Sequence, residues 1–182
     1  MSRAEEAAVP PLDSRAFRNA CGAFGTGVTV VTTRVGEVEH GMTANAFMSI
    51  SLEPPLVAVS IGEKARMLGH IRSARRFAVS ILRQGAQDVA LHFAGRPNND
   101  LDLRFRDLAG LPVICGSAAA FAATVTQEVP AGDHVVFFGR VERMAHEASE
   151  RPLMFHAGRF GCLYEFDAPA GIPAEFAEHS LW

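Results

Sequence analysis

Apolar and polar positions alternate most clearly just before the two prolines at positions 54 and 55. The alternating residues are Met48, Ser49, Ile50, Ser51 and Leu52. This period of two predicts a half-buried strand, and the strand should end at the prolines because proline donates no hydrogen bond to a β-ladder. Residues 56–59 are continuously apolar and predict a second strand that is buried on both faces.

A second pattern, with helical spacing, occupies the first part of the chain. It predicts a helix that starts at Asp13 or Ser14, since either residue can cap a helix. The apolar face of this helix consists of Phe17, Ala20, Cys21 and Phe24. Three closely spaced glycines at positions 22, 25 and 27 should end the helix and release the chain into a strand over residues 28–33.

The later segments follow the same two periodicities. They predict helices over 64–74 and 87–93, and strands over 77–82, 120–128 and 134–145. The last two strands are joined by residues 129–133 and predict an antiparallel hairpin. Strands dominate and do not alternate regularly with helices, which disfavours a doubly wound parallel sheet. The pattern favours a mainly β fold, an antiparallel barrel with a few peripheral helices.

Length and charge narrow the class of protein. The chain has 182 residues, which predicts one domain, expected over residues 13–168 between tails at 1–12 and 169–182. The formal net charge is −3 with acids and bases mixed along the chain, which argues against nucleic acid as a partner. No segment has the apolar length to span a bilayer, and no secretory signal is evident, so we expect a cytoplasmic protein without membrane contact.

Cysteines and metal-binding motifs add little. Cys21, Cys115 and Cys162 are odd in number and widely separated, so we predict small core residues rather than disulfides or zinc ligands. No histidine–cysteine cluster has metal-ligand spacing, and we predict no metal site.

The candidate chemistry lies directly before the alternating strand. Thr43 and Asn45, with the backbone amides around Ala44 and Ala46, form a run of small hydrogen-bonding residues. Such a cluster of neutral donors and acceptors suits a phosphate or the pyrimidine edge of a flavin. An ordinary hairpin whose polar residues face water gives the same pattern, and the spacing alone does not separate the two interpretations.

Four segments together resemble a known family. They are residues 41–60, the glycine–valine strand entry at 24–33, Gly132-Asp133-His134 with the strand after it, and the histidine–glycine–aromatic segment at 152–161. In this order and at these separations they resemble the flavin reductase-like domain, over roughly residues 13–166. That family includes the small reductase components of two-component flavin monooxygenases.

The resemblance implies a fold, an activity and partners. The fold would be a split β-barrel, the flavin reductase-like FMN-binding fold, with flavin bound at a homodimer interface. The implied activity is reduction of FMN or FAD by NADH or NADPH, with the reduced flavin passed to a separate monooxygenase. Two alternatives remain: a non-catalytic flavin-binding or electron-carrier protein on the same barrel, and an enzyme like pyridoxamine-phosphate oxidase. The clustered basic phosphate site expected of the latter is not evident in the sequence.

The resemblance also implies site residues. His134 would position the nicotinamide, and His156 and Arg159 of the C-terminal segment would reach toward the active site. The expected cofactor-binding residues are Thr43, Ala44, Asn45, Ala46, Ser60, Lys64, Arg66, Phe93, Ala94, Gly95 and Phe160. Lys64 and Arg66 serve equally well as solvated cations at a helix start, and Arg159 as one half of an ion pair at a dimer seam.

Two details limit these assignments. The lysine–phenylalanine pair that often follows the Phe93 loop in the family is absent, and residues 101–105 read Leu-Asp-Leu-Arg-Phe instead. Neighbouring residues on a strand point to opposite faces. We therefore expect Asp133 to cap the turn while His134 alone faces the site, although both residues would also suit a plain hairpin corner.

Overall fold

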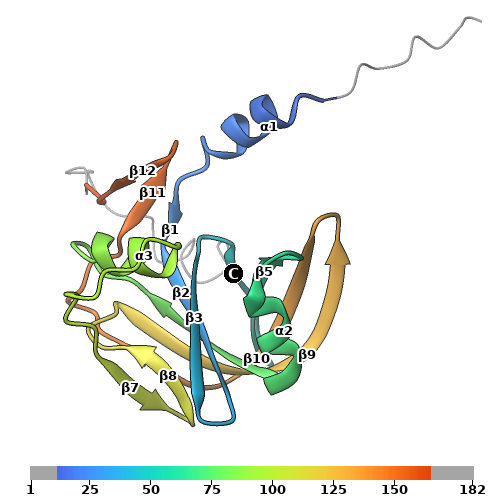
Figure 1. Ribbon diagram of the computed structural model, residues 1–182, viewed down its shortest axis with the longest axis vertical. Coiled ribbons are helices and arrows are strands. Elements are labelled where there is room, and N and C mark those ends of the chain that lie inside the picture. Colours follow the sequence, from blue (N-terminus) through green and yellow to red (C-terminus); the bar gives the residue numbers. More distant parts are fainter. Residues whose placement is uncertain (1–11, 165–182) are drawn as a thin grey trace, which may run out of the picture.

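A computed structural model describes residues 12–164 of the chain (Figure 1). Its main sheet has seven antiparallel strands in the order β3-β2-β6-β9-β10-β5-β4. Their bounds are β2 Thr29–Val35, β3 Val38–Ala44, β4 Phe47–Leu52, β5 Pro55–Gly62, β6 Arg76–Ile81, β9 Ala119–Ala131 and β10 His134–His146. Strongly twisted antiparallel strands of this kind enclose a core between their inner faces. The mainly β class expected from the sequence is confirmed.

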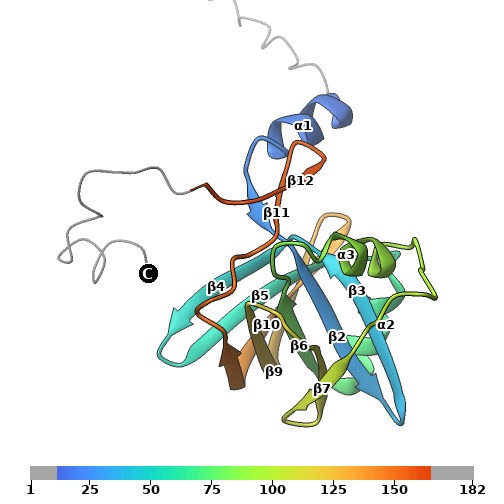
Figure 2. The same ribbon diagram turned by 90° about the vertical axis from the view of Figure 1, so that its left-hand side faces the viewer.

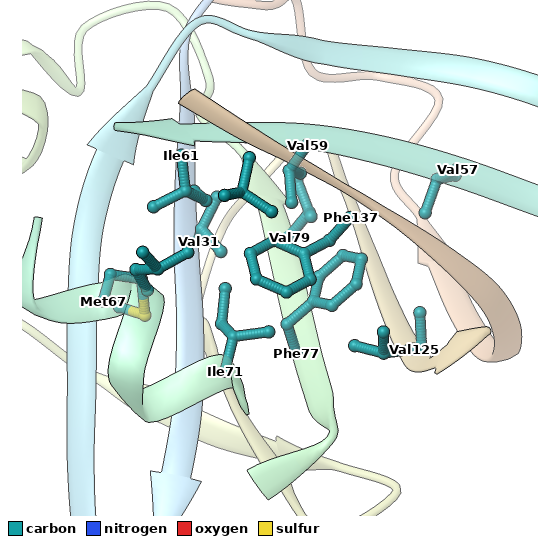
Figure 3. Close-up of a cluster of buried hydrophobic side chains, with 13 residues drawn as sticks. Val31, Val57, Val59, Ile61, Met67, Ile71, Phe77, Val79, Val125 and Phe137 are labelled. Atoms are coloured by element: carbon teal, nitrogen blue, oxygen red, sulfur yellow. The ribbon is translucent and has the colours of Figure 1, made fainter. Parts of the chain in front are cut away.

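The largest core lies inside this sheet, beneath helix α2 (Arg66–Ala74). Figure 3 shows Met67 and Ile71 of α2 directed at side chains of the strands around it. The rings of Phe77 and Phe137 are fully buried there. β10 passes so close to Phe77 that a Cβ at Gly139 would lie 2.6 Å from the ring Cζ, so only glycine fits at this crossing.

A second, smaller core lies under helix α3 (Gln87–Phe93). Beside it runs the hairpin of β7 (Phe105–Leu108) and β8 (Leu111–Ile114), which the sequence did not predict. The connecting residues Ala109 and Gly110 both have positive φ, of 54° and 83°, the geometry of a tight two-residue hairpin turn. Strands of four residues are too short to show a period of two clearly.

The first and last described elements form an arm that projects from the main sheet (Figure 2). We use this name for residues 14–27 and 154–161. It contains α1 (Ser14–Cys21), β1 (Thr26–Gly27), β11 (Met154–His156) and β12 (Arg159–Gly161), and its strands form a small sheet in the order β1-β11-β12. The amide of Ala157 donates to the carbonyl of Gly22 at 2.8 Å, which ties the helix end to the C-terminal hairpin.

The predicted helices and strands exist, with small shifts at their ends. Asp13 caps α1 by accepting a hydrogen bond from the Arg15 amide. None of the helices in residues 12–164 combines the length and apolar character that crossing a bilayer requires. Of the expected N-terminal tail only Leu12 is described; residues 1–11, the last residues of the expected domain and the expected tail from residue 169 lie outside the described residues.

Three predictions of burial are wrong. Met48, Ile50 and Leu52 are 61%, 38% and 71% exposed, because β4 is an edge strand whose opposite side faces the core, with Phe47 stacked on Phe121. A period of two identifies a strand but does not say which face is covered.

The α1 face and the cysteines are the other two. No residue of α1 is buried, and Phe17 and Phe24 are 56% and 78% exposed. Cys21 and Cys115 are exposed thiols and Cys162 is partly exposed, so none is a core residue. The helix and Cys162 belong to the projecting arm or its border, where residues 12–164 offer no opposing layer to cover them.

Candidate functional site

A cleft of about 620 Å³ opens where the end of β3, the end of α3 and the arm meet. The described residues that line it are Val28, Thr43, Ala44, Asn45, Ala90, Leu91, Ala94, Arg96, Phe155, Gly158 and Phe160. The lining is mostly apolar with a few polar groups, which is the usual composition of a small-molecule site. Two hollows of about 640 and 380 Å³ adjoin the cleft along the arm, and Asn45 borders all three.

The polar edge of the cleft comes from the end of β3. The Thr43 hydroxyl donates to the carbonyl of Ala90 in α3 at 2.7 Å, so its proton is already used to join strand and helix. Asn45 is exposed, and no hydrogen bond of its side-chain amide occurs within residues 12–164. Asn45 is therefore the residue at this edge that offers both a donor and an acceptor to a ligand.

An aromatic wall faces that edge. Phe155 of β11 and Phe160 of β12 are paired across the hairpin, with ring centroids 5.5 Å apart and planes at 62°. This edge-to-face arrangement is favourable for aromatic pairs. The hairpin turns at Ala157 and Gly158, which have φ values of 47° and 79°. The wall therefore belongs to the arm, whereas the polar edge belongs to the main sheet.

One cation reaches the cleft. Arg96 is the only residue of the described lining with an ionisable side chain, and no ion-pair partner of its guanidinium lies within the described residues. The chain turns at Gly95, with φ of 89°, and the Arg96 amide donates to the Leu91 carbonyl at 3.1 Å. Arg96 was not among the residues predicted from the sequence. A cation directly after a glycine at the end of a predicted helix was the available signal.

Phe93 supports the cleft from behind. A Cβ at Gly41 would lie 2.5 Å from Cε1 of the Phe93 ring, so α3 packs directly on the backbone of β3. Phe93 also meets Phe105 edge to face, with centroids 6.3 Å apart. Phe93 and Gly95 hold α3 and its end in place, while Ala94 between them lines the cleft.

A second group of the predicted residues lies around the ends of β5 and β10. The Ser60 amide donates to the Ala46 carbonyl at 3.1 Å. His134 is paired with Gly62 across the two strands, and a Cβ at Gly62 would lie 3.6 Å from Nε2 of His134. The His134 ring therefore lies close to the backbone of Gly62. None of these residues lines the cleft.

Asp133 contacts His134 directly. Its carboxylate oxygen lies 2.7 Å from Nδ1 of His134, and this hydrogen bond, followed by the charge of the imidazole, lowers the pKa of Asp133. The expectation that the two side chains face apart is wrong. Asp133 lies in the turn before β10 rather than on the strand, so strand alternation does not apply to it. With Nδ1 bonded to the carboxylate, Nε2 is the nitrogen left for a ligand.

The remaining predicted cations and histidines lie outside the cleft. Lys64 and Arg66 are exposed near the start of α2. His156 and Arg159 are exposed register partners in the hairpin of the arm. The structure thus gathers Thr43, Ala44, Asn45, Ala94 and Phe160 in one cleft. It leaves His134, His156, Arg159, Lys64 and Arg66 on other surfaces of the same chain.

Known proteins are similar to this chain over nearly all of its described residues. The family model of the "Flavin reductase like domain" matches residues 21–163. An "NADH-dependent flavin reductase" of Rhodococcus sp is 44% identical over 150 residues, which cover 81% of this chain and 85% of that protein. The reductase component of a 4-hydroxyphenylacetate 3-monooxygenase from Thermus thermophilus is 41% identical over 140 residues, 77% and 90% of the two chains. Among solved structures, the flavin reductase PheA2 superposes with a TM-score of 0.81 at 47% identity, covering 85% of this chain and all of the other.

Proposed function

The chain belongs to the flavin reductase-like domain family, and from this premise we propose that it is an NAD(P)H-dependent flavin reductase. It would reduce FMN or FAD and supply the product to a separate monooxygenase. The observation that carries the proposal is the cleft, because its lining has the parts that a flavin requires. The named activities of the relatives, which include a reductase component of a monooxygenase, point to the same reaction.

The residues of the cleft fit a flavin on chemical grounds. A flavin has a flat apolar ring, a pyrimidine edge with donors and acceptors, and an anionic phosphate tail. Phe155 and Phe160 offer aromatic surface, the Asn45 amide offers a donor and an acceptor, and Arg96 offers a cation that forms charge-assisted hydrogen bonds to phosphate.

A bound flavin supplies the ring that accepts a hydride from the nicotinamide. The tasks left to this chain are to bind, to orient and to exclude water. Asn45 holds the ring edge from the main sheet, and the wall of the arm limits solvent on the other side. Arg96 anchors the tail. His134, with its Nδ1 bonded to Asp133, presents Nε2 for positioning the nicotinamide.

We include a homodimer in the proposal. The arm carries Phe17 and Phe24, and β4 carries Met48 and Leu52, all more than half exposed. Apolar residues that gather on a projecting element and an edge strand are typical of an interface. We further propose that His134, His156 and Arg159 of one chain reach the cleft of the other, because none of the three lines the cleft of its own chain. Light scattering should give twice 19.5 kDa, and a fully active monomer would contradict this part.

Turnover tests the activity itself. NADH oxidation should require added FMN or FAD, and chromatography of the bound species identifies the flavin. A protein that binds flavin but shows no NADH oxidation is a carrier, and a protein that oxidises pyridoxamine phosphate belongs to the other alternative.

Addition of a flavin-dependent monooxygenase tests delivery of reduced flavin. Fractionation of cells tests the expected cytoplasmic location.

Binding of FMN and riboflavin tests the role of Arg96. Riboflavin lacks the phosphate, so Arg96→Gln should weaken FMN binding about tenfold, or ~1.4 kcal/mol, and leave riboflavin binding nearly unchanged. Arg143→Gln removes an exposed arginine of β10 outside the cleft and serves as the control. Equal losses for both ligands would mean that Arg96 shapes the cleft without contacting the phosphate.

A further inference from the structure

Away from the cleft, two histidines from different elements lie face to face. His40 of β3 and His70 of α2 have ring centroids 3.5 Å apart and planes that differ by 9°. Both residues are partly buried. The contact is long-range in sequence, and it joins the helix to β3, the strand that ends at Ala44 beside the cleft.

The pair lies at the border of α2. The inner side of this helix is apolar, since Met67, Leu68 and Ile71 pack in the main core (Figure 3). His70 instead meets β3, one helical turn after Arg66. The N-cap residue of the helix, Ala65, provides no side-chain hydrogen bond to the helix start. Packing therefore holds the inner side of α2, while the histidine pair closes its partly exposed side.

The surroundings of His70 oppose its charged form. Its pKa lies below the usual value because of burial first, then the neighbouring His40, then Arg66. His40 and Arg66 are the charged or titratable groups among the described residues that act on the His70 ring. The core-facing residues of β2, β5 and β6 beneath α2, such as Val31, Ile61 and Val79, are uncharged. Two neutral imidazoles stack favourably, whereas two protonated rings in contact repel each other.

We propose that the His40–His70 stack is an acid-sensitive contact between α2 and β3. It holds the helix on the strand while both rings are neutral and releases the helix when they are protonated. Release of α2 would also affect His134, because the Glu63 amide just before α2 donates to the carbonyl of Asp133 at 3.0 Å. Asp133 in turn holds His134. Acid would therefore loosen the corner that presents His134 together with the helix. This inference does not depend on the proposed activity.

The direction of the effect follows from proton linkage. His70 takes up a proton less readily in the folded chain than in the unfolded chain, so the unfolded state binds more protons as the pH falls below about 6.5. The stability that the stack contributes is thus complete above that pH. It is lost progressively as the pH falls toward the lowered pKa of the folded chain.

Thermal unfolding of the full chain at about pH 7.5 and about pH 5.5 tests the proposal. His70→Phe keeps a flat ring in the stack and removes its proton-binding nitrogens. We expect this variant to lose less melting temperature on acidification than the wild type, by about 2–4 °C. His146→Phe is the matched control, because it removes an exposed histidine at the end of β10 and should leave the acid loss unchanged.

An acid loss in His70→Phe equal to that of the wild type would overturn the proposal. His40→Phe carries the same expectation from the other ring and replaces His70→Phe if that variant does not fold. Proton NMR gives a measurement that does not rely on variants. The His70 ring should titrate below the usual histidine value of about 6.5 in the wild-type protein, and a His70 midpoint at or above that value would also overturn the proposal.

Discussion

The main sheet and the arm differ in how far their apolar side chains are buried. In the main sheet Phe77 and Phe137 are fully buried under α2, within one chain. In the arm Phe17 and Phe24 are mostly exposed, and no residue of α1 is buried. Apart from its edge strand β4, the main sheet thus covers its own hydrophobic side chains, whereas those of α1 are left uncovered by the described residues. Yet the arm also supplies Phe155 and Phe160, the aromatic wall of the cleft. The part of the molecule that is least self-sufficient therefore completes the site.

Truncating one phenylalanine in each region tests this comparison most strongly. Phe137→Ala removes a fully buried ring and should lower the free energy of unfolding by about 3–5 kcal/mol in urea titrations. Phe24→Ala, at a ring that is 78% exposed, should leave the unfolding of the isolated chain nearly unchanged and weaken self-association instead. Similar losses of unfolding free energy for the two variants would show that the arm is part of the core.

Two glycine substitutions test how tightly β10 of the main sheet packs against Phe77. Gly139→Ala places a methyl group 2.6 Å from the Phe77 ring and 2.9 Å from Cβ of Ala123, and should destabilise the protein by about 1–3 kcal/mol. Gly69→Ala is the matched control, because nothing lies within 4 Å of the added Cβ in α2. The control should stabilise the chain by about 0.5–1 kcal/mol through helix propensity. A neutral Gly139→Ala would mean that the sheet relaxes at this crossing.

His134→Ala tests whether the hairpin corner of the main sheet takes part in flavin reduction at the cleft. We expect flavin reduction at low NADH to slow roughly tenfold, about 1.4 kcal/mol of transition-state positioning, with flavin affinity nearly intact. Stopped-flow reduction of bound flavin at several NADH concentrations measures this, and His146→Ala controls for loss of a histidine elsewhere on β10. Normal rates with a lower melting temperature would make His134 a purely structural corner residue.

The smallest expected effect concerns an ion pair on the outside of the main sheet. Glu142 accepts from the Thr124 hydroxyl at 2.6 Å and from Arg76 at 2.7 Å, and these contacts, in that order, lower its pKa. Glu142→Gln should cost about 0.2–1 kcal/mol at neutral pH, as for other partly exposed pairs.

The pH dependence of that difference follows from the same shift. A lowered carboxylate pKa gives stability that is complete above the unfolded value of 4.5 and disappears as the pH falls through the folded value. Urea titrations of wild type and Glu142→Gln should therefore converge in acid. A difference in unfolding free energy that persists at about pH 3 would mean that the glutamine packs poorly, independent of charge.

Part of this protein could be predicted from local pattern. The strands over 77–82 and 120–128, the helix over 87–93 and the Asp13 cap depend on periodicity and capping, which operate over a few residues. The polar run at Thr43–Asn45 was visible as candidate chemistry for the same reason, and these residues do line the cleft. Arg96 was not predicted, because a cation directly after a glycine at a helix end is a weak signal that a solvated cation gives as well.

What only the tertiary structure decided is which face of each element is covered and which distant residues meet. Met48 and Phe17 have the pattern of core residues, but they lie on an edge strand and on the arm, where no layer formed by the described part of the chain opposes them. Asp133 contacts His134 because the turn, rather than the strand, sets its direction. His40 meets His70 only because α2 folds back across β3. The sequence by itself determined the elements with a clear period, though not short ones such as β7 and β8, since these predictions follow from short-range sterics and periodicity over several residues. Burial and contact between elements required the full fold, because both depend on residues far apart along the chain.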